Sequence, residues 1–427
     1  MSFEPDAYLE SLKPIGWRLG LERMRKLTTA LGLPQHRFAS IHVVGTNGKS
    51  SVTRMTAALL EAHGVTSGAC LSPHMARWSE RTLVHGREIG AEEWSGAVEQ
   101  VARAAEAVDR SLEEGDAVTQ FEAATAATFV ALAKARVQAA AIEAGLGGRL
   151  DATNTIPSRV TVLTSIGRDH TEWLGESELE IAAEKLAVLR DQTTLVLGQV
   201  SPAVEELAEL TAAAHGARVV RAPLDPGPEL RLLAMGEFQR RNFALAMAAA
   251  EAFLGKLDPD RVRDVAATIS IPGRLEQVAA EPATFLDAAH NPDGAAALAE
   301  ALPALAGGKR VVACLAILRD KDAAAMVGAL APVLDRAICT QLPADGPESH
   351  AGGGFSAHRP SVPAAELALL CEGAGVAAEA EADFGRALAR ARALAAETPP
   401  GIVLVAGSHY GIAPAREALS MRGSGHE

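Results

Sequence analysis

Residues 41–55, IHVVGTNGKSSVTRM, combine a short apolar run with a glycine turn, a lysine and two serines. Gly45 and Gly48 allow a tight turn whose backbone N–H groups point at an anion, and a following helix adds its positive N-terminal end. Lys49 is placed to reach the β- and γ-phosphates of a nucleotide, and a hydroxyl just beyond it would join a Mg²⁺ shell. The alternative is an ordinary strand–turn–helix with a solvated lysine. The loop hydroxyls, on Thr46, Ser50 and Ser51, favour phosphate binding.

Two later stretches place charged or coordinating groups where a predicted strand ends. Glu143 ends the run AIE and precedes the glycine-rich LGGRLDATN, which carries Asp151. A carboxylate at the carboxyl end of a strand, beside a phosphate loop, is where a Mg²⁺ ligand belongs. In TSIGRDHTEWLG, Asp169 and His170 occupy a similar turn, and a neutral imidazole can coordinate a second cation. Alone, a strand-end glutamate is more often a cap, and a lone histidine is usually structural.

Other charged residues are weaker candidates when each is taken alone. Lys185 lies in the helical stretch AAEKLAVLR, where a lysine is normally exposed, and composition gives it no role. Arg274 stands at a Pro-Gly break and can neutralise phosphate charge. Asp287 ends a strand and can accept from a ribose hydroxyl, with His290 on the following loop.

Alternating strands and helices must hold these residues in place. The patterns predict helix within 1–40, closed by Pro34, and then helices at 50–63, 91–114 and 119–136. Strands are expected in two sets, first at 41–44, 66–72, 137–145, 159–167 and 193–200, then at 283–290, 309–318, 336–341 and 401–407. This alternation predicts an α/β fold with mainly parallel sheets covered on both faces. The Gly-, Pro-, Ser- and His-rich segment 342–363 reads as a long loop, with His350 and His358 as loop residues.

The 427 residues are too many for one ordinary core, and we expect two domains, 1–271 and 272–427, divided at the Pro272–Gly273 break. A net charge of −13 argues against a nucleic-acid partner. The four cysteines form no C-x-x-C pair and are expected to be reduced and buried. With no signal segment and no apolar run of membrane-spanning length, we expect a cytoplasmic protein with no membrane partner. We also expect a monomer.

Ten stretches taken together resemble one family, folylpolyglutamate synthase/dihydrofolate synthase of the Mur ligase superfamily. They run in order from residue 45 to about 322: GTNGKSS, SPHMARWSERTLVHGREI, TQFEAATAATF, EAGLGGRLDATN, GRDHTEWLG, EKLAVLR, GEFQRRN, PGRLEQV, DAAHNPDG and LRDKD. The resemblance implies a P-loop ATP-binding domain followed by a smaller, Rossmann-like glutamate ligase domain. It also implies an ATP-dependent ligase that phosphorylates a pteroate or folate carboxylate and then joins L-glutamate to it as an amide.

The resemblance also implies roles for individual residues. The expected catalytic residues are Lys49, His170 and Lys185, the last at a position that is carbamylated in many relatives and supports a second metal site. ATP would be bound by Gly45, Thr46, Asn47, Gly48, Lys49, Ser50, Ser51, Asn242, Arg274, Asp287 and His290. Mg²⁺, at two sites, would be bound by Ser50, Ser72, Glu143 and His170. The acid substrate would be bound by Ser72, Pro73, His74, Arg81 and Asp151, with Arg81 as an anion contact.

The chain departs from the family pattern at a few positions and leaves some alternatives open. Ser50 replaces the usual glycine after Lys49, so Ser50, Ser51 and Ser72 all remain candidates for the Mg²⁺ ligand. Phe238 stands where many relatives have histidine, and Ala288 replaces a common glycine. Dihydropteroate, folate or both remain possible substrates. The alternatives are a cell-wall Mur ligase acting on a UDP-muramyl substrate, a P-loop kinase, and a nucleotide-binding module without catalysis.

Overall fold

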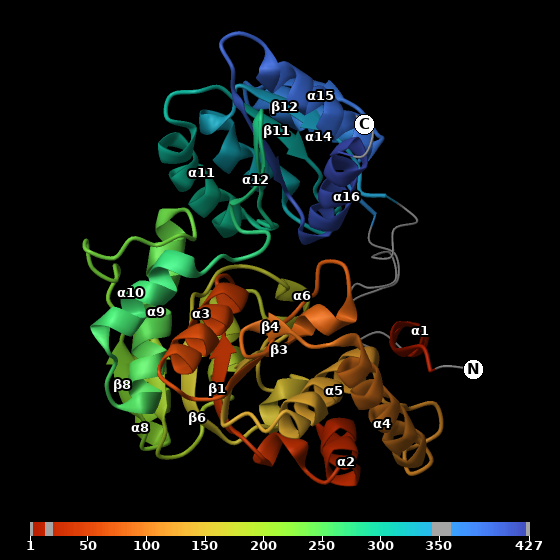
Figure 1. The fold of residues 1–427 in the computed structure, drawn as a ribbon, viewed down its shortest axis with the longest axis vertical. Coiled ribbons are helices and arrows are strands. Elements are labelled where there is room, and N and C mark those ends of the chain that lie inside the picture. Colours follow the sequence, from red (N-terminus) through yellow and green to blue (C-terminus); the bar gives the residue numbers. More distant parts are fainter. Residues whose placement is uncertain (1–2, 13–19, 344–359, 424–427) are drawn as a thin grey trace. The chain divides into compact units, whose positions relative to one another are not determined.

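The computed structural model describes residues 3–12, 20–343 and 360–423, and it divides into two compact units (Figure 1). Within the described residues, the first unit holds those up to 232 together with 240–269. The second holds 233–239 and those from 270 onward. The domain limits expected from the sequence, 1–271 and 272–427, place the boundary two residues after this main division. No sequence signal indicates that Leu233–Gln239 groups with the second unit.

The first unit is built on an eight-stranded sheet in the order β4-β3-β2-β5-β1-β6-β7-β8. Its strands are β1 Ala39–Val44, β2 Ser67–Cys70, β3 Thr82–Val84, β4 Arg87–Glu88, β5 Ala139–Glu143, β6 Ser158–Leu163, β7 Thr194–Leu197 and β8 Arg218–Arg221. All pairs are parallel except β2–β3 and β3–β4. The three middle strands, β5, β1 and β6, are almost wholly buried and mostly apolar, as expected for a sheet covered on both faces.

Helices cover both faces of this sheet (Figure 1). On β5, Ala141 packs in one apolar cluster with Ala57 of α3, while Ala140 and Ile142 pack in another with Phe129 of α5. The two helices therefore lie on opposite faces of the strand. The helices of this unit are α1 Pro5–Ser11, α2 Glu22–Ala30, α3 Lys49–Ala62, α4 Ala91–Asp109, α5 Gln120–Lys134, α6 Thr171–Leu174, α7 Glu178–Leu186, α8 Pro202–Ala214, α9 Glu237–Leu254 and α10 Pro259–Thr268.

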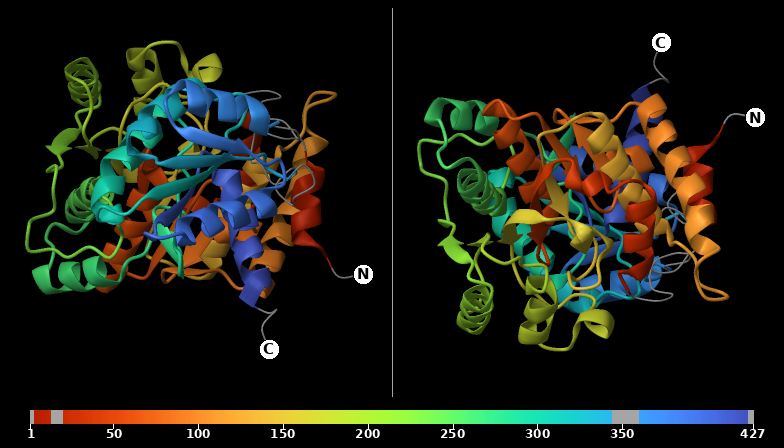
Figure 2. Two further views of the ribbon diagram at one scale, coloured as in Figure 1. Left: turned by 90° about the horizontal axis from the view of Figure 1, so that it is seen from above. Right: turned by 90° about the horizontal axis from the view of Figure 1, so that it is seen from below.

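The second unit is a six-stranded sheet in the order β13-β12-β11-β14-β10-β9, parallel except for the β9–β10 hairpin. Its helices pack on both sides of the sheet (Figure 2). The strands are β9 Glu276–Ala280, β10 Ala283–Leu286, β11 Val311–Leu315, β12 Arg336–Cys339, β13 Ala377–Ala380 and β14 Ile402–Ala406. The helices are α11 Pro292–Ala306, α12 Ala323–Leu330, α14 Ala364–Gly373, α15 Phe384–Ala396 and α16 Ile412–Gly423.

The α/β class and the mainly parallel sheets are confirmed, with local differences. The helical segment expected within 1–40 is two helices, α1 and α2, and Pro34 opens a short 3₁₀ turn at Pro34–His36. The sequence patterns miss β3, β4, β8, β9 and β13, which are short strands at or near the sheet edges with few buried apolar side chains. Most of the loop expected at 342–363, including His350 and His358, lies outside the described residues.

Two further expectations concern the thiols and the helices. All four cysteines are free and buried, as predicted. Among the described residues, no helix is both long enough and apolar enough to cross a membrane.

Candidate functional site

The loop between β1 and α3 is shaped by two glycines with positive φ angles, 150° at Gly45 and 82° at Gly48. A side chain at Gly45 would collide with the hydroxyl of Thr164, and a Cβ at Gly48 would lie 2.6 Å from Oδ1 of Asn242. Glycine is therefore required at both positions by backbone conformation and by space. The same contact places Asn242, on α9, directly against the phosphate loop.

Two amides of this loop are tied to the neighbouring loop after β6. The Thr46 N–H donates to the Ser165 carbonyl at 2.8 Å, and the Asn47 N–H donates to the Ser165 hydroxyl at 3.0 Å. The sequence predicts that successive amides of the whole turn face an anion. In the structure the first part of the turn is used to fix the loop. The amides left to face an anion are therefore those at the start of α3, from Lys49 onward, where the first helical N–H groups have no partner within the helix.

Two lysines converge on one carbonyl oxygen of the loop. Nζ of Lys49 donates to the carbonyls of Gly45 and Thr46, each at 3.1 Å, and Nζ of Lys185 donates to Gly45 O at 2.8 Å. Lys185 is buried, contrary to the usual exposure of a helical lysine. Burial, and then the charge of Lys49, lowers the pKa of Lys185 to about 7. Lys185 is therefore an amine that can be neutral near physiological pH.

Glu143 gathers two of the predicted metal ligands around its carboxylate. Its Oε1 accepts from the Ser50 hydroxyl at 2.8 Å, and its Oε2 accepts from the Ser72 backbone N–H at 3.0 Å. Glu143 is buried at the end of β5, whereas Ser50 is partly open and Ser51 is buried in α3. Of the two loop serines, Ser50 is therefore the one that shares a site with the carboxylate.

These donors suit a hard divalent cation. Hydroxyl and carboxylate oxygens are the ligands that Mg²⁺ prefers, and Mg²⁺ commonly relies on only one or two carboxylates, with phosphates and waters completing its shell. Accordingly, within the described ranges, no three His, Cys, Asp or Glu side chains lie close enough together to hold a metal ion by themselves. Ser50 and Glu143 would hold such a cation, which would neutralise phosphate charge there.

His170 stands at the N-terminus of α6 with a left-handed φ of 53°. The Asp169 carboxylate accepts from the His170 backbone N–H at 3.0 Å, and its Oδ1 lies 3.9 Å from the His170 Nε2. Because β5, β1 and β6 are neighbours and parallel, their carboxyl ends meet at one edge of the sheet. Glu143, the phosphate loop and His170 therefore belong to the same edge.

The loop from Ser72 to Arg81 begins with a cis peptide bond before Pro73. Nε of Arg81 donates to Nδ1 of His74 at 2.9 Å, and the guanidinium lies over the Trp78 ring, 4.4 Å from its centroid. Arg81 is only 2% exposed. This geometry supports a role for Arg81 in holding the loop together. The anion contact expected from the sequence stays a prediction.

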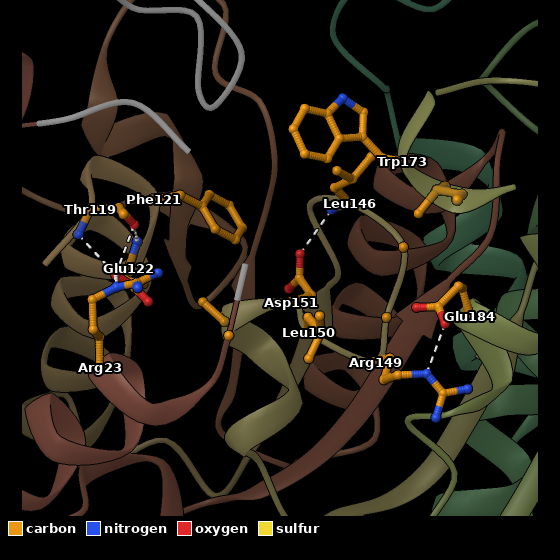
Figure 3. Close-up of a pocket in the computed structure, with 15 residues that line it drawn as sticks. Arg23, Thr119, Phe121, Glu122, Leu146, Arg149, Leu150, Asp151, Trp173 and Glu184 are labelled. Carbon is orange, nitrogen blue, oxygen red and sulfur yellow. Dashed lines mark hydrogen bonds and ion pairs between the residues drawn. The ribbon is translucent and has the colours of Figure 1, made fainter. Parts of the chain in front are cut away.

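A cavity of about 210 Å³ lies over the glycine-rich loop that follows β5 (Figure 3). Its walls include the side chains of Phe121 and Trp173, and Asp151 lies between them at the cavity wall. Asp151 is only 4% exposed, and burial raises the pKa of its carboxyl. Oδ2 of Asp151 accepts from the Leu146 N–H at 2.8 Å. The cavity thus combines aromatic walls with a buried acidic acceptor between them.

A buried ion network forms the side of the cavity that Figure 3 shows around Glu122. Nε of Arg23 lies 3.0 Å from Oε2 of Glu122, and its Nη1 lies 3.2 Å from Asp116. The same Glu122 oxygen accepts from the backbone N–H and the hydroxyl of Thr119, which caps α5. This network joins α2 to the start of α5 and fixes that wall.

The second unit brings its own three candidate residues together. Asp287, after β10, is buried and accepts from the backbone N–H groups of Leu275 and Ala289 at 2.9 and 2.8 Å. Burial raises the pKa of Asp287, and the nearby charges of Arg274 and His290 oppose that rise. Phe238, where many relatives have histidine, packs against the apolar core of the same unit.

Two family models match the chain over most of its length. The Mur ligase middle domain covers residues 43–224, and the Mur ligase glutamate ligase domain covers residues 273–409. A dihydrofolate synthase/folylpolyglutamate synthase of Mycobacterium tuberculosis is 36% identical over 75% of this chain and 74% of its own length. The chain belongs to the dihydrofolate synthase/folylpolyglutamate synthase family. It is an ATP-dependent ligase of the Mur ligase type.

Solved structures of the dihydrofolate synthase/folylpolyglutamate synthase family share the fold. Escherichia coli FolC in complex with DHPP and ADP has a TM-score of 0.80 and 28% identity, over 98% of this chain and 97% of that chain. A bifunctional folylpolyglutamate synthase/dihydrofolate synthase with Mn, AMPPNP and L-glutamate bound has a TM-score of 0.80 and 29% identity, over 98% and 99%.

The motifs of the dihydrofolate synthase/folylpolyglutamate synthase family predict the phosphate loop, the Glu143 cluster and, at the cavity wall, Asp151, but not the aromatic side chains beside it. Phe121 lies in TQFEAATAATF and Trp173 in GRDHTEWLG, yet the resemblance assigns neither of them a role. Arg23 lies outside all ten stretches. It lies in an amphipathic helix that also carries Arg25 and Lys26, so the sequence does not single it out, and its partner Glu122 stands 99 residues away. Only the tertiary fold brings the two together.

Proposed function

We infer that this chain joins L-glutamate to the carboxylate of dihydropteroate, of a reduced folate, or of both, at the expense of ATP. The observation that carries the proposal is the single sheet edge where β5, β1 and β6 end. It holds the phosphate loop, the Glu143 cluster and His170, and the Asp151 cavity opens over the loop that follows β5. A nucleotide, a cation and an aromatic acid can therefore be bound near the same edge of one sheet.

The residues suit a reaction through an acyl phosphate. A carboxylate is a poor electrophile, so an oxygen of the substrate carboxylate attacks the γ-phosphorus, the bond to ADP breaks, and an acyl phosphate forms. The amine of L-glutamate then attacks the acyl carbon, loses a proton and expels phosphate. Lys49 would hold the γ-phosphate as charge develops on it, and the start of α3 would bind the other phosphate oxygens.

The Asp151 cavity supports a pterin as the ring that is bound. A pterin is flat and aromatic, which suits the space between Phe121 and Trp173, and its edge carries adjacent N–H donors. A buried carboxylate that accepts such donors gives the ring a fixed orientation. The family resemblance implies that Asp151 binds the substrate, and the cavity supports that role.

Lys185 fits a second role, as a carbamate that helps to hold a second divalent cation. With its pKa lowered to about 7, the amine is available to add to CO₂, forming a carbamate and releasing one proton. The new negative group would replace a positive charge next to Lys49, whose charge opposes protonation of Lys185. Two cation sites, a monomeric state and a cytoplasmic location belong to this proposal.

The decisive experiment measures ADP release with purified protein, ATP, Mg²⁺ and L-glutamate, with either dihydropteroate or a reduced folate as the acid. We expect release that depends on both glutamate and the acid, together with an amide product one glutamate heavier by mass spectrometry. A UDP-muramyl acid serves as the comparison substrate. The proposal would be rejected if only the UDP-muramyl acid were turned over. It would also be rejected if neither dihydropteroate nor a reduced folate gave glutamate-dependent release of ADP.

Lys49→Ala tests the phosphate role within the same assay. Lys49 would hold the γ-phosphate, so we expect its loss to abolish ADP formation. Because its side chain is only partly buried, we expect little change in the thermal midpoint. Lys256→Ala, at an exposed position just after α9, is the matched control and should keep full turnover. Substantial turnover in Lys49→Ala would remove the lysine from the reaction.

A further inference from the structure

A buried histidine on β1 is connected to the cavity carboxylate through one threonine. Nε2 of His42 lies 2.8 Å from Oγ1 of Thr153, and that hydroxyl donates to Oδ1 of Asp151 at 2.5 Å. The Thr153 backbone N–H donates to the same Oδ1 at 3.0 Å. His42 and Thr153 have no exposed surface, and Asp151 alone of the three lines the cavity.

The directions of these hydrogen bonds follow from the chemistry of the groups. A hydroxyl has one proton, and Thr153 gives it to a carboxylate, so Thr153 must accept from the histidine. His42 therefore carries its proton on Nε2 and is neutral, in agreement with the burial that lowers its pKa to about 3. Its other ring nitrogen, Nδ1, is buried with no hydrogen-bond partner. Leaving this buried nitrogen without a partner costs free energy. The same ring orientation fixes the Nε2–H as a donor to Thr153.

The chain of bonds has a consequence for Asp151. Oδ1 receives both the hydroxyl and the backbone N–H of Thr153, so it is fully engaged on the side away from the cavity. Oδ2 accepts from the Leu146 N–H. A ligand that donates to Asp151 from the cavity therefore meets Oδ2, in an orientation set by Thr153.

We propose that His42 and Thr153 are positioning residues that hold the Asp151 carboxylate for recognition of the acid substrate's ring. This inference rests on the proposed function, because it assigns Asp151 to that ring. Neither residue touches the reacting carboxylate or the phosphates. Their loss should therefore weaken binding of the ring and leave the chemical step and the other two substrates alone.

The kinetic test uses substitutions of matched size. Thr153→Val removes the hydroxyl and keeps the shape, and we expect the KM for the pteroate or folate substrate to rise about tenfold, with kcat and the KM for ATP nearly unchanged. Thr153→Ser keeps the hydroxyl and should restore most of the affinity. Thr161→Val is the control: Thr161 is a buried threonine opposite His42 on β6, its hydroxyl has no partner, and its loss should change no KM.

A double-mutant cycle tests the link to His42. His42→Leu removes the donor to Thr153, whereas His42→Gln keeps an N–H donor at a similar reach and should behave nearly as wild type. In His42→Leu with Thr153→Val, the rise in KM should equal that of Thr153→Val alone, because both changes break one chain. Additive increases in KM in the double variant, or equal increases in the KM values for all three substrates, would overturn the proposal.

A measurement without substrate separates this proposal from the proposed function. In ¹⁵N-histidine NMR, with the His42 signal assigned by its loss in His42→Gln, the neutral Nε2–H tautomer is expected. An Nδ1–H tautomer or a charged ring at pH 7 would contradict the hydrogen bonds from His42 through Thr153 to Asp151, whatever substrate the enzyme uses. Failure of the turnover assay in wild type, with the expected tautomer present, would instead reject the assignment of the substrate.

Discussion

At the scale of single residues, the site depends on groups whose ordinary behaviour is altered by their surroundings. Lys185 would be a charged surface lysine in most helices, and here it is buried beside a second lysine. Ser50 would be a solvated hydroxyl at a helix start, and here it donates to Glu143. In both cases the neighbouring residue comes from a distant part of the sequence, so the sequence motif alone does not reveal the altered state.

Ser50→Gly restores the usual family residue and tests whether the Ser50 hydroxyl is a metal ligand. If it is, the Mg²⁺ concentration needed for half-maximal ADP release should rise by about tenfold, since one inner oxygen ligand is lost. Titrating Mg²⁺ at saturating ATP measures this. Ser51→Ala, in which a buried neighbour is changed, should leave the requirement where it is. If only Ser51→Ala raises the Mg²⁺ requirement, Ser51 is the metal ligand. If neither variant changes the requirement, the role belongs to Ser72.

At the scale of elements, the strand ends explain how much of the site is predictable from the sequence. Buried strands read clearly as apolar runs, and in a parallel sheet their carboxyl ends share an edge, so the sequence alone predicts that Glu143, the phosphate loop and His170 lie near one another. The cavity is not predictable in this way. It is walled by α2, α5, α6, α7 and the loop after β5, and its contacts depend on how these helices pack against one another. The His42–Thr153 pair is equally hidden, since a histidine within an apolar strand reads as a core residue.

Gly48→Ala tests the close packing between the phosphate loop and α9. The added methyl meets both a left-handed φ of 82° and the Asn242 side chain, so we expect a lower thermal midpoint and a loss of most of the stabilisation by ATP. Gly64→Ala, just beyond the other end of α3, is the matched control, because Gly64 also has a φ of 82° but nothing within 4 Å. Equal effects of the two changes would mean that backbone strain alone, and not contact with Asn242, constrains Gly48.

At the scale of the whole molecule, two units each carry part of the recognised pattern. The first holds the phosphate loop, the Glu143 cluster and the cavity, and the second holds Arg274, Asp287 and His290. All four tryptophans lie before residue 174, so tryptophan fluorescence reports on the first part of the chain only. That is useful because unfolding of a protein with two units need not be a single transition.

The pH dependence of stability is a whole-molecule consequence of burying Lys185. Between the folded pKa of about 7 and the ordinary value of 10.5, the unfolded chain binds a proton that the folded chain does not. The stability contributed by this residue therefore falls as pH drops from 10.5 to 7 and stays low below 7. Lys185→Met should remove this penalty, raising the free energy of unfolding at pH 7 by several kcal/mol and at pH 10 by much less.

Denaturant unfolding followed by tryptophan fluorescence, in CO₂-free buffer, measures this difference. Lys256→Met, at an exposed position, should have no effect at either pH. A Lys185→Met variant that is less stable than wild type by the same amount at both pH values would mean that the amine is held as a charged, well-bonded group. In either case the variant is expected to lose ligase activity. If Lys185→Met is the more stable protein, the lysine is retained for function at a cost in stability.

The alanines of β5 have a consequence for the spacing between layers. Ala139, Ala140 and Ala141 fill the central strand on both of its faces, and the small side chain of Ala141 lets the covering helix α3 approach the strand closely. An added methylene at Ala141 would push α3 outward, because the close packing leaves no space for it. The nucleotide end of α3 and the cavity wall on α5 would then move apart. The small side chains of β5 thus contribute to the spacing between the phosphate loop and the cavity.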